Sequence, residues 1–376
     1  MEKRREKMDS LVQEALEAAN RTYNAQPSTP MTPDEIEKEF GLKMTEANIM
    51  VLGAGGAGNN CVTRLFDMGI KGAKTIAINT DVKHLSISRA DERILIGKEL
   101  THGLGAGGYP EIGKKAAEES EREIKRALNG CDMLYIVTGL GGGTGTGSAP
   151  VVARIAREMG AIVIGNVTMP FRIEGARMAK AEDGLYQLRQ HCDTVVVLEN
   201  EKLLKVAGDL PLQKAFAVAD NLISTMIKGI TETISQPSLV NLDFADVKAI
   251  MHTGGVATVG YGESDTGQRA EEAIVKALNN PLLEVDYRGG KGALIHITGG
   301  KDLKLDEVNL IGEYVSKQLD PDAQVIWGSR ILPEFAGRLQ VITIITGIKS
   351  PWILGPVPQE MQRKDYSHEM GISVLK

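Results

Sequence analysis

The chain has 376 residues, which is long for one hydrophobic core and suits two domains. Hydrophobic residues make up 42% of the chain and charged residues 24%, as in ordinary globular proteins. The formal net charge is −6, and no concentrated basic face of the kind that binds an extended phosphate backbone appears. These features argue against a nucleic-acid-binding protein, because an extended phosphate-binding surface needs clustered basic side chains.

The sequence carries no pattern typical of export or of a membrane span. The N-terminal stretch MEKRREKMDSLVQEALEAAN has no apolar core of signal-peptide length, and no apolar run is long enough to cross a bilayer. Cys61, Cys131 and Cys192 lie singly in apolar or helical stretches, which favours buried free thiols over a zinc site. We therefore expect a soluble cytoplasmic protein without direct membrane insertion.

Residues 1–44 are predicted to form a helical extension followed by a linker. Leu11, Ala15 and Ala19 recur at helical spacing, and the following NAQPSTPMTPDEI contains several prolines. The extension is interpreted as a tethered helix outside the main domains.

Residues 45–208 alternate between strand-like and helical segments. The strand-like segments are ANIMVLG, AKTIAIN, RILIG, MLYIVTG, AIVIGNVTM and TVVVLEN. One of the intervening helices is predicted at Pro110 to Leu128. Such alternation is typical of an α/β domain with a doubly wound, mostly parallel sheet.

A long helix and a second domain are predicted to follow. Residues 209–235 form the central helix, in which apolar residues recur at spacings of three and four. Residues 236–350 contain the β-type patches HTGGVATVGYGES, GALIHITGG, QVIWGSRI and RLQVITIITGI, with helices predicted at 268–279 and 304–319. This pattern indicates a smaller α+β domain, and residues 351–376 form a tail.

The first glycine-rich loop lies between a predicted strand and a predicted helix. Gly53, Gly55 and Gly58 in GAGGAG have the dinucleotide-binding spacing, and Asp81 stands about 20 residues further on, where a ribose-binding acid is expected. Taken alone, this loop favours NAD as the ligand. The alternative is that the glycines only permit a tight turn between the strand and the helix.

A second glycine-rich loop, GGGTGTG at Gly141–Gly147, points to a different nucleotide. Its glycines let backbone N–H groups converge near a helix N-terminus, while Thr144, Thr146 and Ser148 add hydroxyl groups. A dehydrogenase needs no second phosphate loop. With a third loop, GLGAGG, these cradles supply enough donors for a triphosphate without the lysine of a P-loop.

These motifs resemble the tubulin/FtsZ family. GGGTGTG is similar to the tubulin signature, and GAGGAGNN, NTD, GLGAGG, PFRIEG and NLDFADV resemble the FtsZ branch in an archaeal-type form with an N-terminal extension. The likeness covers about residues 45 to 348. Together with Asp81, the nucleotide-binding residues expected in the phosphate loops are Gly55, Gly56, Gly58, Asn59, Asn60, Ala106, Gly107, Gly108, Gly141, Gly142, Gly143, Thr144, Gly145, Thr146 and Gly147.

The same resemblance implies contacts for the sugar and the base. Glu174 and Arg177 correspond to sugar and phosphate contacts, although the segment between them is one residue shorter than the commoner bacterial pattern. Asn200, Phe216 and Asp220 resemble a guanine pocket, in which a ring stacks on the base and a carboxylate accepts from its donor edge. The ligand is therefore expected to be GTP or GDP, with Mg²⁺ bound mainly through the phosphates and water rather than by protein ligands.

The segment QPSLVNLDFADVKAIM offers Asn241, Asp243 and Asp246 as catalytic candidates. Without context, acids here are typical of the first turn of a helix that begins near Asp243. About twenty residues of mostly helical chain separate Asp220 from Asn241, which implies roughly 30 Å at ~1.5 Å per residue. These side chains would therefore act on the nucleotide of a neighbouring subunit, in a head-to-tail contact that produces an open filament.

The resemblance implies a GTPase that assembles with itself at the division site. A membrane-tethering or division-regulating partner could bind the tail, where Ile372, Val374 and Leu375 form a short apolar peptide. Two rival functions stay open from the sequence. An NAD-dependent oxidoreductase would leave GGGTGTG without a purpose, and a non-hydrolysing scaffold would bind GTP and assemble without releasing phosphate.

Overall fold

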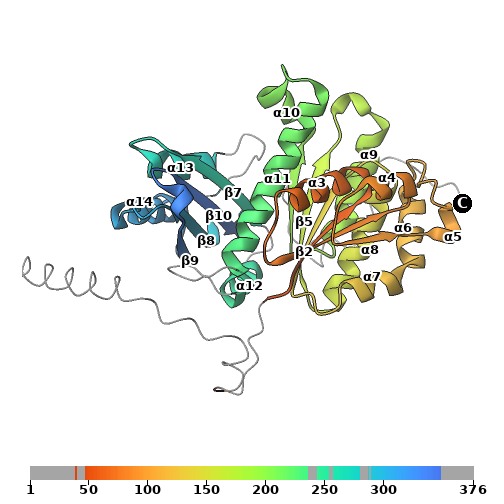
Figure 1. The fold of residues 1–376 in the computed structure, drawn as a ribbon, viewed down its shortest axis with the longest axis horizontal. Helices are drawn as coiled ribbons and strands as arrows, with labels where there is room; N and C mark the ends of the chain where they lie inside the picture. The colour runs from red at the N-terminus through yellow and green to blue at the C-terminus, as the bar shows by residue number, and fades with distance from the viewer. Residues whose placement is uncertain are drawn as a thin grey trace, which may run out of the picture. The chain divides into compact units, whose positions relative to one another are not determined.

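The computed structural model describes residues 47–235, 244–253, 257–279 and 289–348, together with Glu39 and Tyr287. The predicted N-terminal extension and tail lie outside the described residues, and the predicted domain limits stay predictions. Two sheets and one long helix organise the described part of the chain (Figure 1).

The first sheet has six parallel strands in the order β3-β2-β1-β4-β5-β6. The strands are β1 (Ile49–Ala54), β2 (Ala73–Asn79), β3 (Glu92–Leu95), β4 (Met133–Gly139), β5 (Ile162–Met169) and β6 (Thr194–Glu199). The predicted doubly wound parallel sheet is confirmed. The strand order reverses direction between β1 and β4, and a ligand crevice is expected at the carboxyl ends of those two strands.

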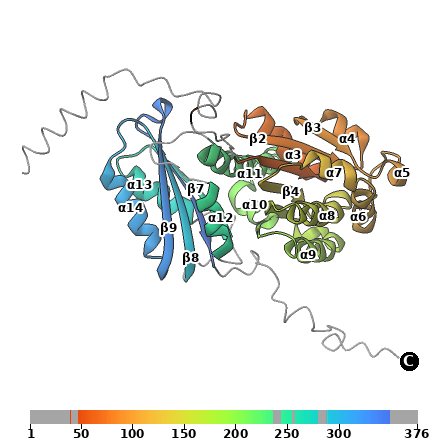
Figure 2. The same cartoon turned by 90° about the horizontal axis from the view of Figure 1, so that it is seen from below.

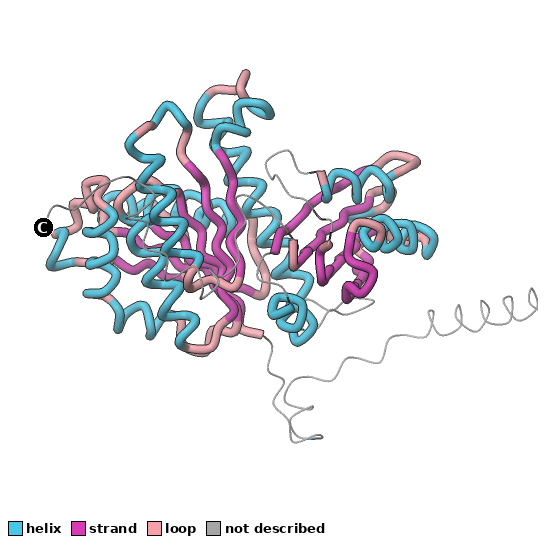
Figure 3. The backbone as a smooth tube through the Cα atoms, turned by 180° about the vertical axis from the view of Figure 1, so that it is seen from behind, coloured by secondary structure: helices cyan, strands magenta, loops and turns pink. Residues whose placement is uncertain are grey.

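Helices cover both faces of this sheet, which explains why its central strands are buried and nearly continuous in apolar residues (Figure 3). One face carries α6 (Pro110–Glu119), α7 (Glu121–Ala127), α8 (Thr144–Glu158) and α9 (Ala176–Arg189). The other carries α3 (Gly55–Asp67), α10 (Asn200–Ala207) and α11 (Leu212–Ser235). The connections contain α4 (Val82–Ile87), α5 (Lys98–Thr101) and the 3₁₀ helix η1 (Arg172–Glu174).

The prediction of one helix from Pro110 to Leu128 is wrong. The helix breaks at Ser120, which separates α6 from α7. The hydroxyl of Ser120 accepts a hydrogen bond of 3.0 Å from the backbone N–H of Gly97, so a distant loop holds the residue at the break. Nothing in the local spacing of apolar residues indicates that contact.

Helix α11 runs along α3 from the carboxyl edge of the first sheet toward its amino edge. Cys61 in α3 contacts the carbonyl of Asp220, at 3.8 Å from its Sγ atom. Fifteen residues later, Ser235 donates to the carbonyl of Lys71, just before β2 begins. The predicted long central helix is therefore confirmed, and its two ends lie at opposite edges of the sheet.

The second sheet has four strands in the order β7-β10-β8-β9. They are β7 (Ala257–Ser264), β8 (Gly290–Gly299), β9 (Leu319–Ile331) and β10 (Leu339–Thr346), and only the β8–β9 pair is parallel. Helices α13 (Arg269–Leu278) and α14 (Leu305–Ser316) cover one face, while α12 (Phe244–Thr253) and α11 contact the other (Figure 2). The 3₁₀ helix η2 (Pro333–Phe335) precedes β10.

The predicted α+β character of this region is confirmed, with one change of boundary. The helix predicted at 304–319 is too long, because β9 already begins at Leu319 to pair with β8. The three cysteines are free and buried, as predicted. Within the described ranges, no helix is long and apolar enough to cross a membrane.

Candidate functional site

The first glycine loop joins β1 to α3 at the carboxyl edge of the sheet. Gly55 has φ +71°, and a Cβ placed on it would lie 2.8 Å from the backbone nitrogen of Gly145. Two of the three glycine-rich loops therefore meet backbone to backbone. A side chain on either residue would push them apart, which explains why glycine is needed here.

The two asparagines of this loop lie in different surroundings. Asn59 is fully buried, and with its amide turned so that both atoms find partners, it donates to the Gly53 carbonyl at 2.8 Å and accepts from Asn79 at 3.1 Å. Asn60 is exposed and lines a groove that also contains Phe216 and Asp220. Asn59 thus shapes the loop, whereas Asn60 is available to a ligand.

The second loop turns at Gly141–Gly143 and opens directly into α8 at Thr144. Gly141 has φ +91°, and its N–H donates to the Thr146 hydroxyl at 2.9 Å, which closes the turn. The hydroxyls of Thr144 and Thr80 share a hydrogen bond of 2.6 Å. The N-terminus of α8 therefore lies beside the N-terminus of α3, and two adjacent helix N-termini attract anions.

Two glycines of this loop, Gly145 and Gly147, serve packing. A Cβ on Gly145 would overlap the Thr138 hydroxyl, and one on Gly147 would overlap the Pro110 carbonyl. Gly142 differs from both, since a Cβ there would meet open space. The loop thus combines close contacts behind it with room in front, as a phosphate cradle requires.

The third loop lies against the second. A Cβ on Gly143 would stand 2.8 Å from the Ala106 Cβ and 3.1 Å from the Gly108 nitrogen. Gly107 and Gly108 have φ of +60° and +77°, which orients their N–H groups in a way that few other residues permit. All three predicted loops therefore meet at the carboxyl edge of the first sheet.

Asp81 and Lys180 both contact the third loop, Asp81 through an isolated β-bridge to Leu104. The Asp81 carboxylate caps α4, where its Oδ1 atom accepts from Lys83 and His84 at 2.8 and 3.1 Å. Lys180 of α9 donates to the Gly108 carbonyl at 2.8 Å and lies 5.4 Å from the centre of the Tyr109 ring. Sequence reasoning missed Lys180, because its position on a helix carries no motif.

Glu174 and Arg177 form an ion pair beside the second glycine-rich loop, Gly141–Gly147. The Arg177 Nη1 atom lies 2.6 Å from the Glu174 Oε2 atom, and Glu174 also accepts from the Phe171 N–H at 3.0 Å. A Cβ on Gly141 would stand 2.8 Å from the Arg177 carbonyl. The shorter segment between the two residues therefore still brings Arg177 next to the phosphate loop.

The groove near Asn60 lies between α3 and α11. Phe216 is 39% exposed, and its ring centre lies 6.0 Å from that of Phe171, at an interplanar angle of 59°. Burial raises the pKa of Asp220 to about 6, and the nearby Arg64 opposes this shift. Asn200 begins α10 at the carboxyl end of β6, on the same edge of the sheet.

Thr80, Phe171 and Arg64 contact predicted site residues, but the sequence motifs assign them no role. Thr80 belongs to NTD, and Phe171 belongs to PFRIEG. Arg64 lies on α3 without any distinguishing spacing, so only the packing of α3 on α11 brings it to Asp220.

Of the candidate catalytic residues, the one that the structure describes lies in α12, beside the C-terminal end of α11 (Figures 1 and 2). Asn241 and Asp243 fall outside the described residues, and Asp246 stands in the first turn of α12. The fifteen residues between Asp220 and Ser235 alone span roughly 22 Å at ~1.5 Å per residue. Asp246 is therefore not brought together with the glycine loops of its own chain.

Comparisons with known proteins agree with this architecture. Residues 48–208 match the family model "Tubulin/FtsZ family, GTPase domain", and residues 255–349 match "FtsZ family, C-terminal domain". "Cell division protein FtsZ 2" of Methanocaldococcus jannaschii is 57% identical over 85% of this chain and 84% of its own. The chain belongs to the FtsZ family.

Other FtsZ relatives cover nearly the whole chain. "Cell division protein FtsZ 1" of Pyrococcus furiosus is 49% identical over 98% of this chain and 99% of its own. The solved structure "FtsZ dimer, empty (M. jannaschii)" matches with a TM-score of 0.77 at 52% identity, over 84% of this chain and 93% of that one. The GTPase-domain family implies guanine-nucleotide binding, and the open cradle at Gly142 fits such a ligand.

Proposed function

We propose that this FtsZ-family chain hydrolyses GTP to GDP and phosphate in a site completed by a neighbouring subunit, within head-to-tail filaments of the division ring in the cytoplasm. The observation that carries the proposal is the separation of α12 from the glycine loops by the length of α11. A heterologous contact of this kind joins unlike faces and does not close, so subunits add indefinitely.

The nucleotide side of the site follows from the loops. The backbone N–H groups at the starts of α3 and α8, with Ala106, Gly107 and Gly108, bind the phosphates. Glu174 and Arg177 contact the sugar and phosphates, while Asn200 and Asp220 accept from the base, on which Phe216 stacks. Among the described residues no cluster of three His, Cys, Asp or Glu side chains forms a metal site, and Mg²⁺ would be held mainly through phosphates and water.

The neighbouring subunit supplies the other half. Asp243 and Asp246 polarise the attacking water and Asn241 positions it, while the loop amides stabilise charge on the transferred phosphoryl group. Hydrolysis then weakens the contact that enabled it. The tail would bind a membrane-tethering or division-regulating protein.

Two variants with opposite defects test the shared site. Asp246→Ala should bind GTP normally but lose hydrolysis by about 100-fold or more. Gly142→Trp should fill the open cradle and abolish binding while leaving the fold intact, because a side chain there meets open space. Each variant alone is inactive, and a mixture should regain phosphate release because Asp246 of one subunit reaches GTP held by the other.

Asp306→Ala is the matched control, since Asp306 is also a first-turn acid of a helix in the same domain. It should hydrolyse GTP at the normal rate. If the two folded variants stay inactive when mixed, or if the rate per subunit of the unmodified chain is independent of concentration, the shared site is refuted. A scaffold without GTPase activity would assemble with GTP yet release no phosphate.

A further inference from the structure

A groove runs along the C-terminal domain between α14 and β9, the edge strand of the second sheet. Ile295 and Ile297 of β8 form its floor, and Trp327 of β9 forms one wall. Gly312 and Ser316 lie on the opposite wall, which α14 provides. The groove is therefore apolar at its base and open along one side.

Exposed apolar side chains border this groove. The Trp327 side chain is 42% exposed, and Leu305 at the far end is 79% exposed. The parallel register pairs Trp327 with Ile295, so both side chains stand on the face that α14 covers. An apolar segment seated between α14 and Trp327 would remove this surface from water.

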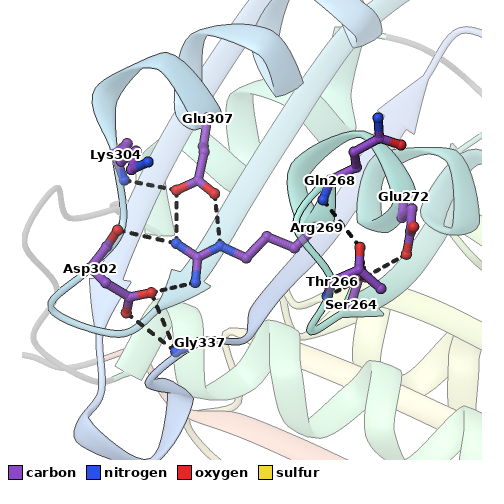
Figure 4. Close-up of polar contacts among 9 residues, drawn as sticks. All are labelled: Ser264, Thr266, Gln268, Arg269, Glu272, Asp302, Lys304, Glu307 and Gly337. Atoms are coloured by element: carbon purple, nitrogen blue, oxygen red, sulfur yellow. Dashed lines mark hydrogen bonds and ion pairs between the residues drawn. The ribbon is translucent and has the colours of Figure 1, made fainter.

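The wall that α14 provides is fixed before anything binds. Arg269, at the start of α13, donates to both carboxylate oxygens of Glu307 at 2.7 and 2.9 Å and to Asp302 at 2.5 Å (Figure 4). Glu307 also accepts from the Lys304 N–H at 2.9 Å. The first turn of α14 is thereby tied to α13, and an occupant of the groove need not order it.

The described chain ends beside one end of the groove. Thr346 of β10 pairs with Gly292 of β8, which pairs with Gln324 of β9, so the end of β10 lies level with the first half of β9. Helix α14 ends at Ser316, just before β9 starts. Ile348 is buried in the cluster that α14 covers, and the chain therefore continues from the Ser316 end of the groove.

The next apolar residues of the sequence are Trp352, Ile353 and Leu354. Two strand spacings, about 10 Å, separate β10 from β9, and four extended residues beyond Ile348 span about 13 Å. We propose that Trp352–Leu354 dock into the groove between α14 and β9 of their own chain and cover Trp327. Attachment to the same chain gives the segment a high effective concentration, so a small apolar contact suffices.

Gly312 supports this assignment. It lies inside α14, where glycine costs about 1 kcal/mol relative to alanine. A Cβ on Gly312 would meet no other atom within 4 Å, so the packing of the described residues does not require glycine there. A glycine at this position leaves space in the groove for a bound segment, which a larger side chain would fill.

Tryptophan fluorescence of the full chain tests the docking directly. The chain has two tryptophans, so Trp352→Phe leaves Trp327 as the single reporter while keeping an aromatic ring in the segment. Adding Ile353→Ser and Leu354→Ser should release the segment, shift the Trp327 emission to longer wavelength and raise its acrylamide quenching about twofold. Measurements are made on dilute protein without nucleotide, so that GTP-dependent assembly plays no part.

Gly312→Leu fills the groove from the other side and should release the segment without changing its sequence. Trypsin cleavage after Lys349 should then accelerate about tenfold relative to Gly312→Ala, whose small side chain leaves most of the groove open. Thermal melting checks that both variants fold. The proposal is overturned if the two serine substitutions leave the acrylamide quenching of Trp327 unchanged. It is also overturned if protection of Lys349 from trypsin rises with protein concentration, because the segment would then bind a second copy of the chain.

Discussion

The two sheets of this molecule are held at their loop edges in opposite ways. At the carboxyl edge of the first sheet, glycine backbones from three loops touch one another, and no room is left for side chains behind them. At the edge of the second sheet where β8 ends, a single arginine reaches across from α13 to bind two acids. Larger side chains should therefore destabilise the glycine loops of the first sheet, whereas smaller or uncharged side chains should destabilise the arginine cluster of the second.

The largest effect is expected from a side chain added behind the signature loop. In Gly147→Val, the new atoms would overlap the Pro110 carbonyl and crowd the Lys114 nitrogen, both of which belong to helix backbone that cannot move cheaply. The free energy of unfolding should fall by more than about 3 kcal/mol, measured by denaturant titration. Nucleotide binding should be lost with it.

Gly142→Ala is the control for this prediction, because its Cβ enters open space. The free energy of unfolding should stay within about 0.5 kcal/mol of the unmodified chain. A stable Gly147→Val protein that had lost only nucleotide binding would contradict the assignment of Gly147 to packing.

Motifs in the sequence located the crevice because parallel strands and glycine-rich loops have strong local patterns. The same motifs could not separate Gly142, which faces open space, from Gly145 and Gly147, which pack on Thr138 and Pro110. That distinction depends on contacts between segments far apart in the chain. The break at Ser120 was missed for the same reason, since its partner is the backbone of Gly97.

The ionic clamp in the second sheet was also invisible in the sequence. Arg269 opens an ordinary-looking helix, and its partners Asp302 and Glu307 lie more than thirty residues further on. The length of α11 could be predicted from its apolar spacing. The length of a helix can be predicted from the local spacing of apolar residues, whereas a side-chain cluster between elements depends on the tertiary fold.

An intermediate effect is expected from Arg269→Met. The arginine side chain is only 8% exposed, and its loss leaves Glu307 without the cation that holds the pKa of that carboxyl below its usual range. The free energy of unfolding should fall by about 2–3 kcal/mol. Because the pKa of Glu307 is lowered on folding, the clamp stabilises at neutral pH and weakens as the pH falls through that pKa.

Lys317→Met is the matched control, since it breaks an exposed pair with Glu313 on the same domain. It should cost under about 1 kcal/mol. Equal losses for the two variants in denaturant titration would mean that Arg269 acts as an ordinary surface cation.

The smallest effect concerns the base pocket, where burial raises the pKa of Asp220 to about 6. If the carboxylate accepts hydrogen bonds from guanine, only its ionised form binds. Lowering the pH from 7 to 5 should then weaken nucleotide binding by about tenfold, because each pH unit below the pKa shifts the ionised fraction by nearly that factor.

Asp220→Asn should bind more weakly at pH 7, and the part of the pH dependence that belongs to Asp220 should vanish. Isothermal titration calorimetry of both proteins at the two pH values separates Asp220 from the phosphates, which titrate in each case. Identical slopes for the two proteins would place the base recognition elsewhere in the groove and leave the raised pKa as a consequence of packing α11 on α3.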